Sequence, residues 1–311
     1  MLSNEWQILI VGRPPVTCDD EEGDARPIPN SPRMTPTAAA PVRMLNALPQ
    51  RLRVAPSSAR VARVISLANQ KGGVAKTTST VNLAAALKER GKRVLVVDLD
   101  PQSNLTMSFG VDPERIEKSM FDVLVSRLPI TDVIHEREVD LAASSIDLAG
   151  AELAMASMIG RERTLEKAFA PIKKDYDYIL IDTPPSLGLL TINAFTASDG
   201  VIVPVQCEYL SLRGLVQLEA TLEMIRENLN RGVKIVGILP TMVDKRTVHA
   251  REALQLLTDN FGDLVYTTRI RKTVKLAEAP VRGGSVLSYQ PDGPAAMAYR
   301  SLAEEVLSRD E

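Results

Sequence analysis

Residues 68–78 read A-N-Q-K-G-G-V-A-K-T-T, and this stretch decides the fold. An apolar run over residues 61–67 precedes it, and small, apolar and polar side chains alternate over residues 78–90. This order predicts a strand, a glycine-bearing turn and a helix start. Such a turn points backbone N–H groups and the positive end of a helix dipole at one place, where phosphate binds. Lys76 would add a positive charge there, and the Thr77 hydroxyl could hold Mg²⁺.

The stretch departs from the general phosphate-loop pattern G-x-x-x-x-G-K-[ST] at both glycines, which are Gln70 and Ala75 here. It fits the variant K-G-G-x-x-K-[ST], called a deviant Walker A loop, which begins with an additional lysine, Lys71. A plain Gly-Gly turn is the alternative interpretation. The two lysines, two glycines and two threonines within residues 71–78 favour phosphate binding instead. Ala75 must then tolerate the backbone angles that the usual glycine adopts.

Composition sets the broad class of the protein. The chain has 311 residues, enough for one large α/β domain or two small ones, with 45% hydrophobic and 24% charged residues. This balance is typical of a soluble globular protein. The net charge of −2 means that any basic surface for nucleic acid must be local. Cys18 and Cys207 lie too far apart in sequence to suggest a metal or redox pair, which favours a reducing cytoplasm.

Residues 1–60 differ from the remainder. They hold nine of the 20 prolines and an acidic cluster over residues 19–22. We expect a mostly disordered tail, because such a segment buries too little apolar surface to offset its ordering entropy. Its scattered arginines could contact a partner or nucleic acid, although a solvated leader is the simpler interpretation. We expect no signal peptide and no membrane span.

From residue 61 onward, predicted strands and helices alternate. After the first strand, further strands are expected at 93–99, 139–143, 178–181, 200–205, 233–239 and near Leu264; helices are expected at 78–90, 147–174, 210–228, 249–260 and 294–307. This alternation predicts an α/β fold, a mostly parallel twisted sheet with helices on both faces. Residues 61–311 would form this single P-loop domain. Ligands of such sheets bind beyond the carboxyl ends of the strands.

Acidic side chains follow two of the predicted strands. Asp98 and Asp100 end the strand at 93–99, and Asp182 ends the strand at 178–181. An acid at a strand end downstream of a phosphate loop is where a nucleotide hydrolase holds Mg²⁺. Asp100 is the candidate for positioning the attacking water, and Lys71 is the candidate for a second cation at the transferring phosphate.

These motifs resemble the ParA/Soj family of chromosome- and plasmid-partitioning ATPases. The matching stretches are N-Q-K-G-G through T at 69–78, V-D-L-D-P-Q at 97–102, I-D-T-P-P-S-L-G at 181–188, V-P-V-Q at 203–206 with E-Y at 208–209, and L-A-E-A-P at 276–280. They occur in family order from about residue 61 to the C-terminus. The first 60 residues are not covered.

The resemblance implies roles for individual residues. The loop Lys71, Gly72, Gly73, Val74, Ala75, Lys76, Thr77 and Thr78 would bind ATP, and Thr77 with Asp182 would hold Mg²⁺. Lys71 would reach across a dimer to the nucleotide of the other subunit, and Gly72 would let the subunits approach. Asp100 would serve hydrolysis. The ATP-bound homodimer would bind DNA without sequence specificity, and a ParB-like centromere-binding protein would stimulate hydrolysis and release it. The expected location is the cytoplasm, on the nucleoid.

Two short stretches, residues 244–247 and 269–275, carry six basic residues. On resemblance, Arg246 and Lys275 match positions that contact the DNA backbone, and Arg271 and Lys272 lie beside the second. Lysine and arginine on one face bind phosphates by releasing counterions, with little base readout. A solvated charged loop is the alternative. Relatives often have Pro-Arg-Asn where this chain has residues 271–273, so the adenine contacts expected there and near Met242 stay open.

Three rival functions remain. A MinD-like membrane-cycling ATPase shares the variant loop but ends in a basic amphipathic helix, whereas this chain ends E-E-V-L-S-R-D-E. A nitrogenase-iron-protein-like reductase needs cluster-ligating cysteines, which Cys18 and Cys207 do not supply. An ATP-gated DNA-binding scaffold with negligible turnover would lack the water-positioning acid, and the presence of Asp100 argues for hydrolysis.

Overall fold

The computed structural model describes residues 61–207, 211–244 and 247–310. All of them belong to one compact unit, Ala55–Glu311. The predicted tail over residues 1–60 therefore lies outside the described residues. No helix in the described ranges is long and apolar enough to cross a membrane.

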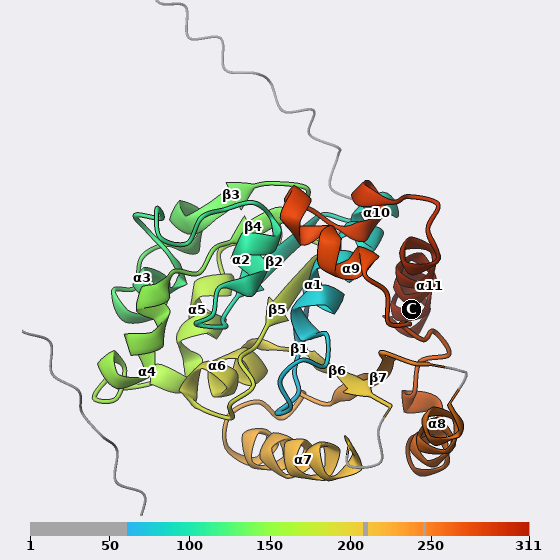
Figure 1. Cartoon of the computed structure of the whole chain (residues 1–311). Coiled ribbons are helices and arrows are strands. Elements are labelled where there is room, and N and C mark those ends of the chain that lie inside the picture. The colour runs from blue at the N-terminus through green and yellow to red at the C-terminus, as the bar shows by residue number, and fades with distance from the viewer. Residues whose placement is uncertain (1–60, 208–210, 245–246, 311) are drawn as a thin grey trace, which may run out of the picture. The chain divides into compact units, whose positions relative to one another are not determined.

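A seven-stranded sheet forms the centre of the described part of the chain, in the order β3-β4-β2-β5-β1-β6-β7 (Figure 1). Its strands are β1 (Arg63–Leu67), β2 (Val94–Asp98), β3 (Ile134–Glu136), β4 (Asp140–Ala142), β5 (Tyr178–Asp182), β6 (Gly200–Gln206) and β7 (Ile235–Thr241). Every pairing is parallel except that of β3 with β4. All residues of β2 and β5 are buried, because helices cover both faces, which explains their continuous apolar sequences.

Eleven α-helices connect these strands in the described residues. They are α1 (Lys76–Glu89), α2 (Asn104–Ser108), α3 (Met120–Val125), α4 (Ala151–Ala154), α5 (Thr164–Phe169), α6 (Leu189–Ala197), α7 (Ser211–Asn228), α8 (Val248–Phe261), α9 (Lys275–Glu278), α10 (Val286–Tyr289) and α11 (Pro294–Asp310). Short 3₁₀ turns join several of them: η1 (Ile130–Val133), η2 (Ile146–Gly150), η3 (Arg161–Arg163), η4 (Gly262–Leu264) and η5 (Pro280–Arg282).

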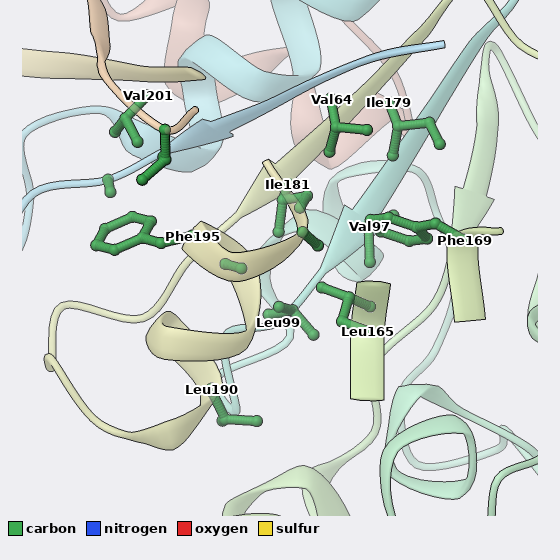
Figure 2. Packing of buried hydrophobic residues seen from close by; sticks show 14 of the residues in the cluster. Val64, Val97, Leu99, Leu165, Phe169, Ile179, Ile181, Leu190, Phe195 and Val201 are labelled. Atoms are coloured by element: carbon green, nitrogen blue, oxygen red, sulfur yellow. The ribbon is translucent and has the colours of Figure 1, made fainter. Parts of the chain in front are cut away.

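The sheet separates two hydrophobic cores. Side chains of α3, α5, α6 and α7 fill one face, and side chains of α1, α2, α10 and α11 fill the other. Figure 2 shows the first core, where Phe169 of α5 and Phe195 of α6 lie against strand residues such as Val97 and Ile181. This three-layer arrangement confirms the predicted fold class and leaves the carboxyl edge of the sheet for the site.

Some predicted elements differ from the observed ones. The prediction of a strand near Leu264 is wrong: Leu264 is the last residue of η4, and Val265 forms a single bridge with Ile238. The helical stretch expected over 147–174 is broken into η2, α4, η3 and α5, with Gly160 at φ 67° before η3. The antiparallel edge strand β3 and the helices α3 and α6 were not predicted, because short segments carry little periodicity.

Candidate nucleotide-binding site

The loop between β1 and α1 contains the strained backbone that the sequence predicts at Ala75. Gly73 has φ 73°, and Ala75, the residue before α1, has φ 67° and ψ 34°. Both are in the left-handed region, where a side chain costs about 1–2 kcal/mol. Ala75 therefore does adopt a conformation that glycine adopts freely. The first turn of α1 holds no acidic residue, so its N–H groups present an uncompensated positive field.

Neighbouring strands hold this loop in place. The Asn69 side chain donates to the carbonyl of Pro204 at 2.7 Å and accepts from the N–H of Lys71 at 2.9 Å. The Thr241 hydroxyl, at the end of β7, donates to the carbonyl of Val74 at 3.1 Å. The loop is thus fixed from β6 and β7 as well as from its own strand and helix, which preorganises its backbone for a ligand.

The two lysines of the loop occupy different environments. Lys76 is buried, with 7% of its surface exposed. Burial lowers its pKa, while the charges of Asp182 and Asp100 oppose that shift. Lys71 is exposed, and its Nζ donates to Oε1 of Gln206 at 3.1 Å. One lysine therefore faces the acids inside the site, and the other lies at its rim.

Asp182 and Thr77 meet at the carboxyl edge of the sheet. The Thr77 hydroxyl donates to Oδ2 of Asp182 at 2.6 Å, and Asp182 is completely buried. Burial raises the pKa of Asp182 well above its usual value, the charge of Asp98 adds to this, and the bond from Thr77 acts against it. Oδ1 of Asp182 is buried and has no hydrogen-bond partner among the described residues. A spare carboxylate oxygen beside a hydroxyl fits Mg²⁺, which prefers few protein ligands with phosphate and water completing its shell.

Asp98 lies next to Asp182 in the sheet and supports the acidic loop behind it. The two residues are register partners of β2 and β5. Burial raises the pKa of Asp98 to about 7, against hydrogen bonds from Thr106 and Asp100 that lower it. Asp100 is itself buried, and its N–H donates to Oδ1 of Asp98 at 3.1 Å. Oδ1 of Asp100 accepts from the N–H of Gln102 at 3.0 Å.

The structure thus brings together the sequence-predicted residues Lys76, Thr77, Asp100 and Asp182. Met242 lies directly after β7 at the same edge, half-buried and with φ 52°. Sequence reasoning missed the roles of Asn69 and Thr241, which tie the loop down. Asn69 had a usable signal, because asparagine before a tight turn commonly bonds the backbone two residues on. Thr241 had none, since its contact joins segments 167 residues apart.

The expected DNA-binding residues lie partly on the surface. Arg271 and Lys272 are exposed and follow Ile270, whose N–H donates to the carbonyl of Pro240 at 2.9 Å. Lys275 is half-exposed, and its Nζ donates to Oε2 of Glu278 at 2.8 Å. Arg246 lies outside the described residues.

Comparison with known proteins agrees with this geometry. The family described as an AAA domain matches residues 62–235. The chain is 45% identical to the sporulation initiation inhibitor protein Soj of Bacillus subtilis, over 78% of this chain and 98% of that protein. It is 40% identical to the chromosome partitioning protein ParA of Caulobacter vibrioides, over 80% of this chain and 95% of that protein.

Solved structures give the same fold. A crystal structure of cobyrinic acid a,c-diamide synthase from Mycobacterium smegmatis, with bound ATP analog and magnesium, matches at TM-score 0.70 and 40% identity, over 79% of this chain and 95% of that one. The septum site-determining protein MinD from Pyrococcus horikoshii, complexed with Mg-ADP, matches at TM-score 0.66 and 28% identity, over 79% and 96% of the two chains.

Fold, phosphate loop and strand-end acids together define a P-loop nucleotide hydrolase of the ParA/MinD type. Within that class, the chain belongs to the ParA/Soj family.

Proposed function

We propose that this protein is a DNA-partitioning ATPase. It binds ATP and Mg²⁺ at the loop Lys71–Thr78, forms an ATP-sandwich homodimer and binds DNA without sequence preference. A ParB-like protein stimulates slow hydrolysis and releases the DNA. The protein acts in the cytoplasm, on the nucleoid. Its 40% identity to the chromosome partitioning protein ParA of Caulobacter vibrioides supports this proposal.

The contrast between the two loop lysines carries the proposal. Lys76 is buried between Asp182 and Asp100, where it neutralises phosphate charge within its own subunit. Lys71 lies exposed at the rim, on a backbone that Asn69 fixes at 2.9 Å. A cation held at the rim of one pocket is placed to reach a phosphate in the pocket of a second copy. Dimerisation and nucleotide state are then thermodynamically linked.

The described residues divide the work of hydrolysis. Thr77 and Asp182 would hold Mg²⁺, which when bound neutralises charge on the terminal phosphates. The N–H groups at the start of α1 and the Lys76 ammonium orient the same phosphates. Asp100 holds the attacking water in line, because its carboxylate is fixed at Oδ1 by Gln102 and leaves Oδ2 for the water.

Exposed cations support the DNA-binding step. Arg271 and Lys272 lie at the carboxyl edge of the sheet, beside the end of β7. Phosphate contacts from such residues give binding that depends strongly on salt and little on sequence. Lys275 must exchange its bond to Glu278 for a phosphate before it contributes.

The C-terminal helix argues against the MinD-like alternative. Tyr299, Leu302 and Val306 of α11 are buried in the second core, so its apolar face packs on protein. At its end, Asp310 accepts a hydrogen bond from the Tyr178 hydroxyl at 2.9 Å. A helix that inserts into lipid needs its apolar face free. We therefore expect that α11 does not insert into lipid, so that replacing its exposed Met297 by Glu leaves co-sedimentation with anionic phospholipid vesicles unchanged, with or without ATP.

The dimer is tested with Lys71→Ala. We expect ATP binding to the monomer to change by less than about threefold, while ATP-dependent dimerisation is lost. In the proposed dimer, Lys71 leaves the rim of its own pocket and forms a charge-assisted hydrogen bond to a phosphate of the other subunit's ATP. Analytical ultracentrifugation with ATP and Mg²⁺ measures the dimer fraction. Lys118→Ala, an exposed lysine paired with Asp132 at 3.5 Å, is the matched control. An unchanged dimer fraction in Lys71→Ala would refute the sandwich.

DNA binding is tested with Arg271→Ala combined with Lys272→Ala. We expect weaker binding to every duplex alike and a salt slope reduced by about one to two, since each lost phosphate contact removes close to one released counterion. Fluorescence anisotropy over a salt series measures both quantities. The control is Lys234→Ala. Lys234 is exposed and lies directly before the start of β7, at the other edge of the sheet. Loss of binding to one sequence alone would contradict non-specific binding.

Hydrolysis itself is tested with water as the sole acceptor. We expect phosphate release from ATP by the wild-type protein with Mg²⁺ and DNA present. Phosphate release that begins only after both a carboxylate acceptor and ammonia are added would instead favour the amide formation that the name of the Mycobacterium smegmatis neighbour indicates.

A further inference from the structure

A buried hydrogen-bond network lies behind Asp100. Its members are Asp98 at the end of β2, Thr106 in α2, and Ser144 in the loop after β4. Asp98, Thr106 and Ser144 are all completely buried. None of them contributes to the phosphate loop, and the proposed function assigns none of them a role.

The hydrogen bonds of this network connect Thr106 to Asp98, and Asp98 to Asp100. The N–H and hydroxyl of Thr106 both donate to Oδ2 of Asp98, at 2.8 and 2.7 Å. The other oxygen of Asp98, Oδ1, accepts from the N–H of Asp100 at 3.1 Å. Thr106 thus fixes one side of a carboxylate whose other side holds the backbone of Asp100.

Ser144 completes the network from the loop after β4. Its N–H donates to Oγ1 of Thr106 at 2.9 Å, which orients the Thr106 hydroxyl hydrogen toward Asp98. Its own hydroxyl lies 3.4 Å from the carbonyl oxygen of Asp100. Asp98 therefore contacts the backbone of Asp100 at its N–H, and Ser144 contacts it at its carbonyl oxygen.

We propose that Thr106 is a positioning residue for ATP hydrolysis, acting through Asp98 to hold Asp100 where it aligns the attacking water. This role rests on the proposed ATPase function and on Asp100 as its water-positioning acid. Without the Thr106 hydroxyl, Asp98 loses a donor and the buried Ser144 N–H loses its acceptor. Both groups then shift to find new partners, and Asp100 moves with Asp98. Small misplacements of a reacting group are expensive, reaching about 100-fold in rate for 1 Å.

A positioning role predicts a specific pattern of kinetics. Thr106→Val keeps the side-chain volume but removes the hydroxyl. We expect the single-turnover hydrolysis rate to fall about 10- to 100-fold. ATP affinity, measured with a fluorescent ATP analogue, should change less than about threefold, because Thr106 does not reach the phosphate loop. Thr106→Ser restores the hydroxyl and should recover most of the rate.

The decisive comparison is a double-mutant cycle with Asp100→Ala. If Thr106 acts through Asp100, Thr106→Val causes no further loss of rate in the Asp100→Ala protein, because coupled residues are non-additive. A general loosening of the fold would lower the rate by the same factor in both backgrounds, and that result would overturn the role. An unchanged rate in Thr106→Val alone would overturn it as well.

Folding and function are kept separate in this experiment. If Thr106→Val does not fold, Thr106→Cys, with a similar volume and a weaker donor, provides the same cycle. Absence of hydrolysis in the wild-type protein overturns the proposed function and this role with it. Hydrolysis in the wild type with an additive cycle overturns this role alone.

Discussion

The site is built from two strand–loop–helix units that begin alike and end differently. β1 leads through the phosphate loop into α1, and β2 leads through the acidic loop into α2. In each unit the residue before the helix is a non-glycine in the left-handed region: Ala75 at φ 67° and Ser103 at φ 52°. Neither makes a side-chain capping bond to its helix.

The two loops differ in what satisfies their backbone. Around the acidic loop, the carboxylates of Asp98, at the end of β2, and of Asp100 accept the N–H groups of Asp100, Gln102 and Thr106. The phosphate loop carries no acid, and its carbonyl at Val74 is held from outside by Thr241. One loop therefore leaves its N–H groups for an anionic ligand, whereas the other uses its own anions to become rigid. In the proposed mechanism, this difference would separate nucleotide binding from water positioning.

Among these tests of the two loops, Asp100→Ala should have the largest effect. If the acidic loop positions water and does not bind nucleotide, the hydrolysis rate should fall about 10²- to 10⁴-fold, the range for a lost acid–base group. ATP affinity should stay within about threefold. Single-turnover hydrolysis and ATP titration measure the two effects. Asp112→Ala, an exposed acid paired with Arg115 at 3.2 Å, is the control. Normal hydrolysis in Asp100→Ala would remove Asp100 from the mechanism.

Thr77→Val tests the other loop at its metal side. Removing the hydroxyl leaves Oδ2 of Asp182 without its 2.6 Å donor, and it would remove one of the two side chains proposed to hold Mg²⁺. We expect Mg²⁺-dependent ATP affinity to fall about 10- to 100-fold, the usual size of a disturbed metal site. ATP affinity measured in EDTA should be nearly unchanged. Thr77→Ser keeps the hydroxyl and should behave like the wild type; an equal loss in EDTA would contradict a metal role.

The division between the loops also shows what the sequence could predict. Asp182 stands at the end of one apolar run, Lys76 and Thr77 follow the loop after another, and parallel strands bring such ends to one edge. The pattern alone therefore predicted which residues meet. The pairing of Lys275 with Glu278 was not predicted, because it depends on the short helix α9, and no helix was expected over residues 275–278.

Other parts of the site were not predictable from the sequence. Thr106 and Ser144 are ordinary small polar residues that lie 38 residues apart in sequence. Only the folded topology brings them into contact. The region between α2 and α5 consists of short elements, such as β3 and α4, whose three or four residues cannot show a period. Its placement follows from tertiary packing on the first core and not from local propensity.

Ser103→Gly measures the strain in the acidic loop. It removes a left-handed side chain and a buried hydroxyl that has no hydrogen-bond partner among the described residues. We expect a gain of about 1–3 kcal/mol in unfolding free energy, since an unsatisfied buried polar group alone costs this much. Chemical denaturation measures it. Ser103→Ala removes the same hydroxyl but keeps the strained Cβ, and should therefore recover most of the gain. A loss of stability in Ser103→Gly would mean that the hydroxyl has a stabilising contact.

Ala75→Gly makes the matching change in the phosphate loop, with the smallest expected effect. It relieves about 1–2 kcal/mol of left-handed strain, but glycine adds about 0.5–1 kcal/mol of backbone entropy to the unfolded chain. The net gain is between about 0 and 1.5 kcal/mol, or at most roughly 6 °C in Tm for a domain of this size. Gly73→Ala and Gly91→Ala are the reverse tests, because both glycines have positive φ and an added Cβ would meet nothing within 4 Å. Each should lose stability through backbone strain alone. If Ala75→Gly instead destabilises the protein, the Ala75 methyl contributes packing that outweighs its strain, and the two loops differ in this respect too.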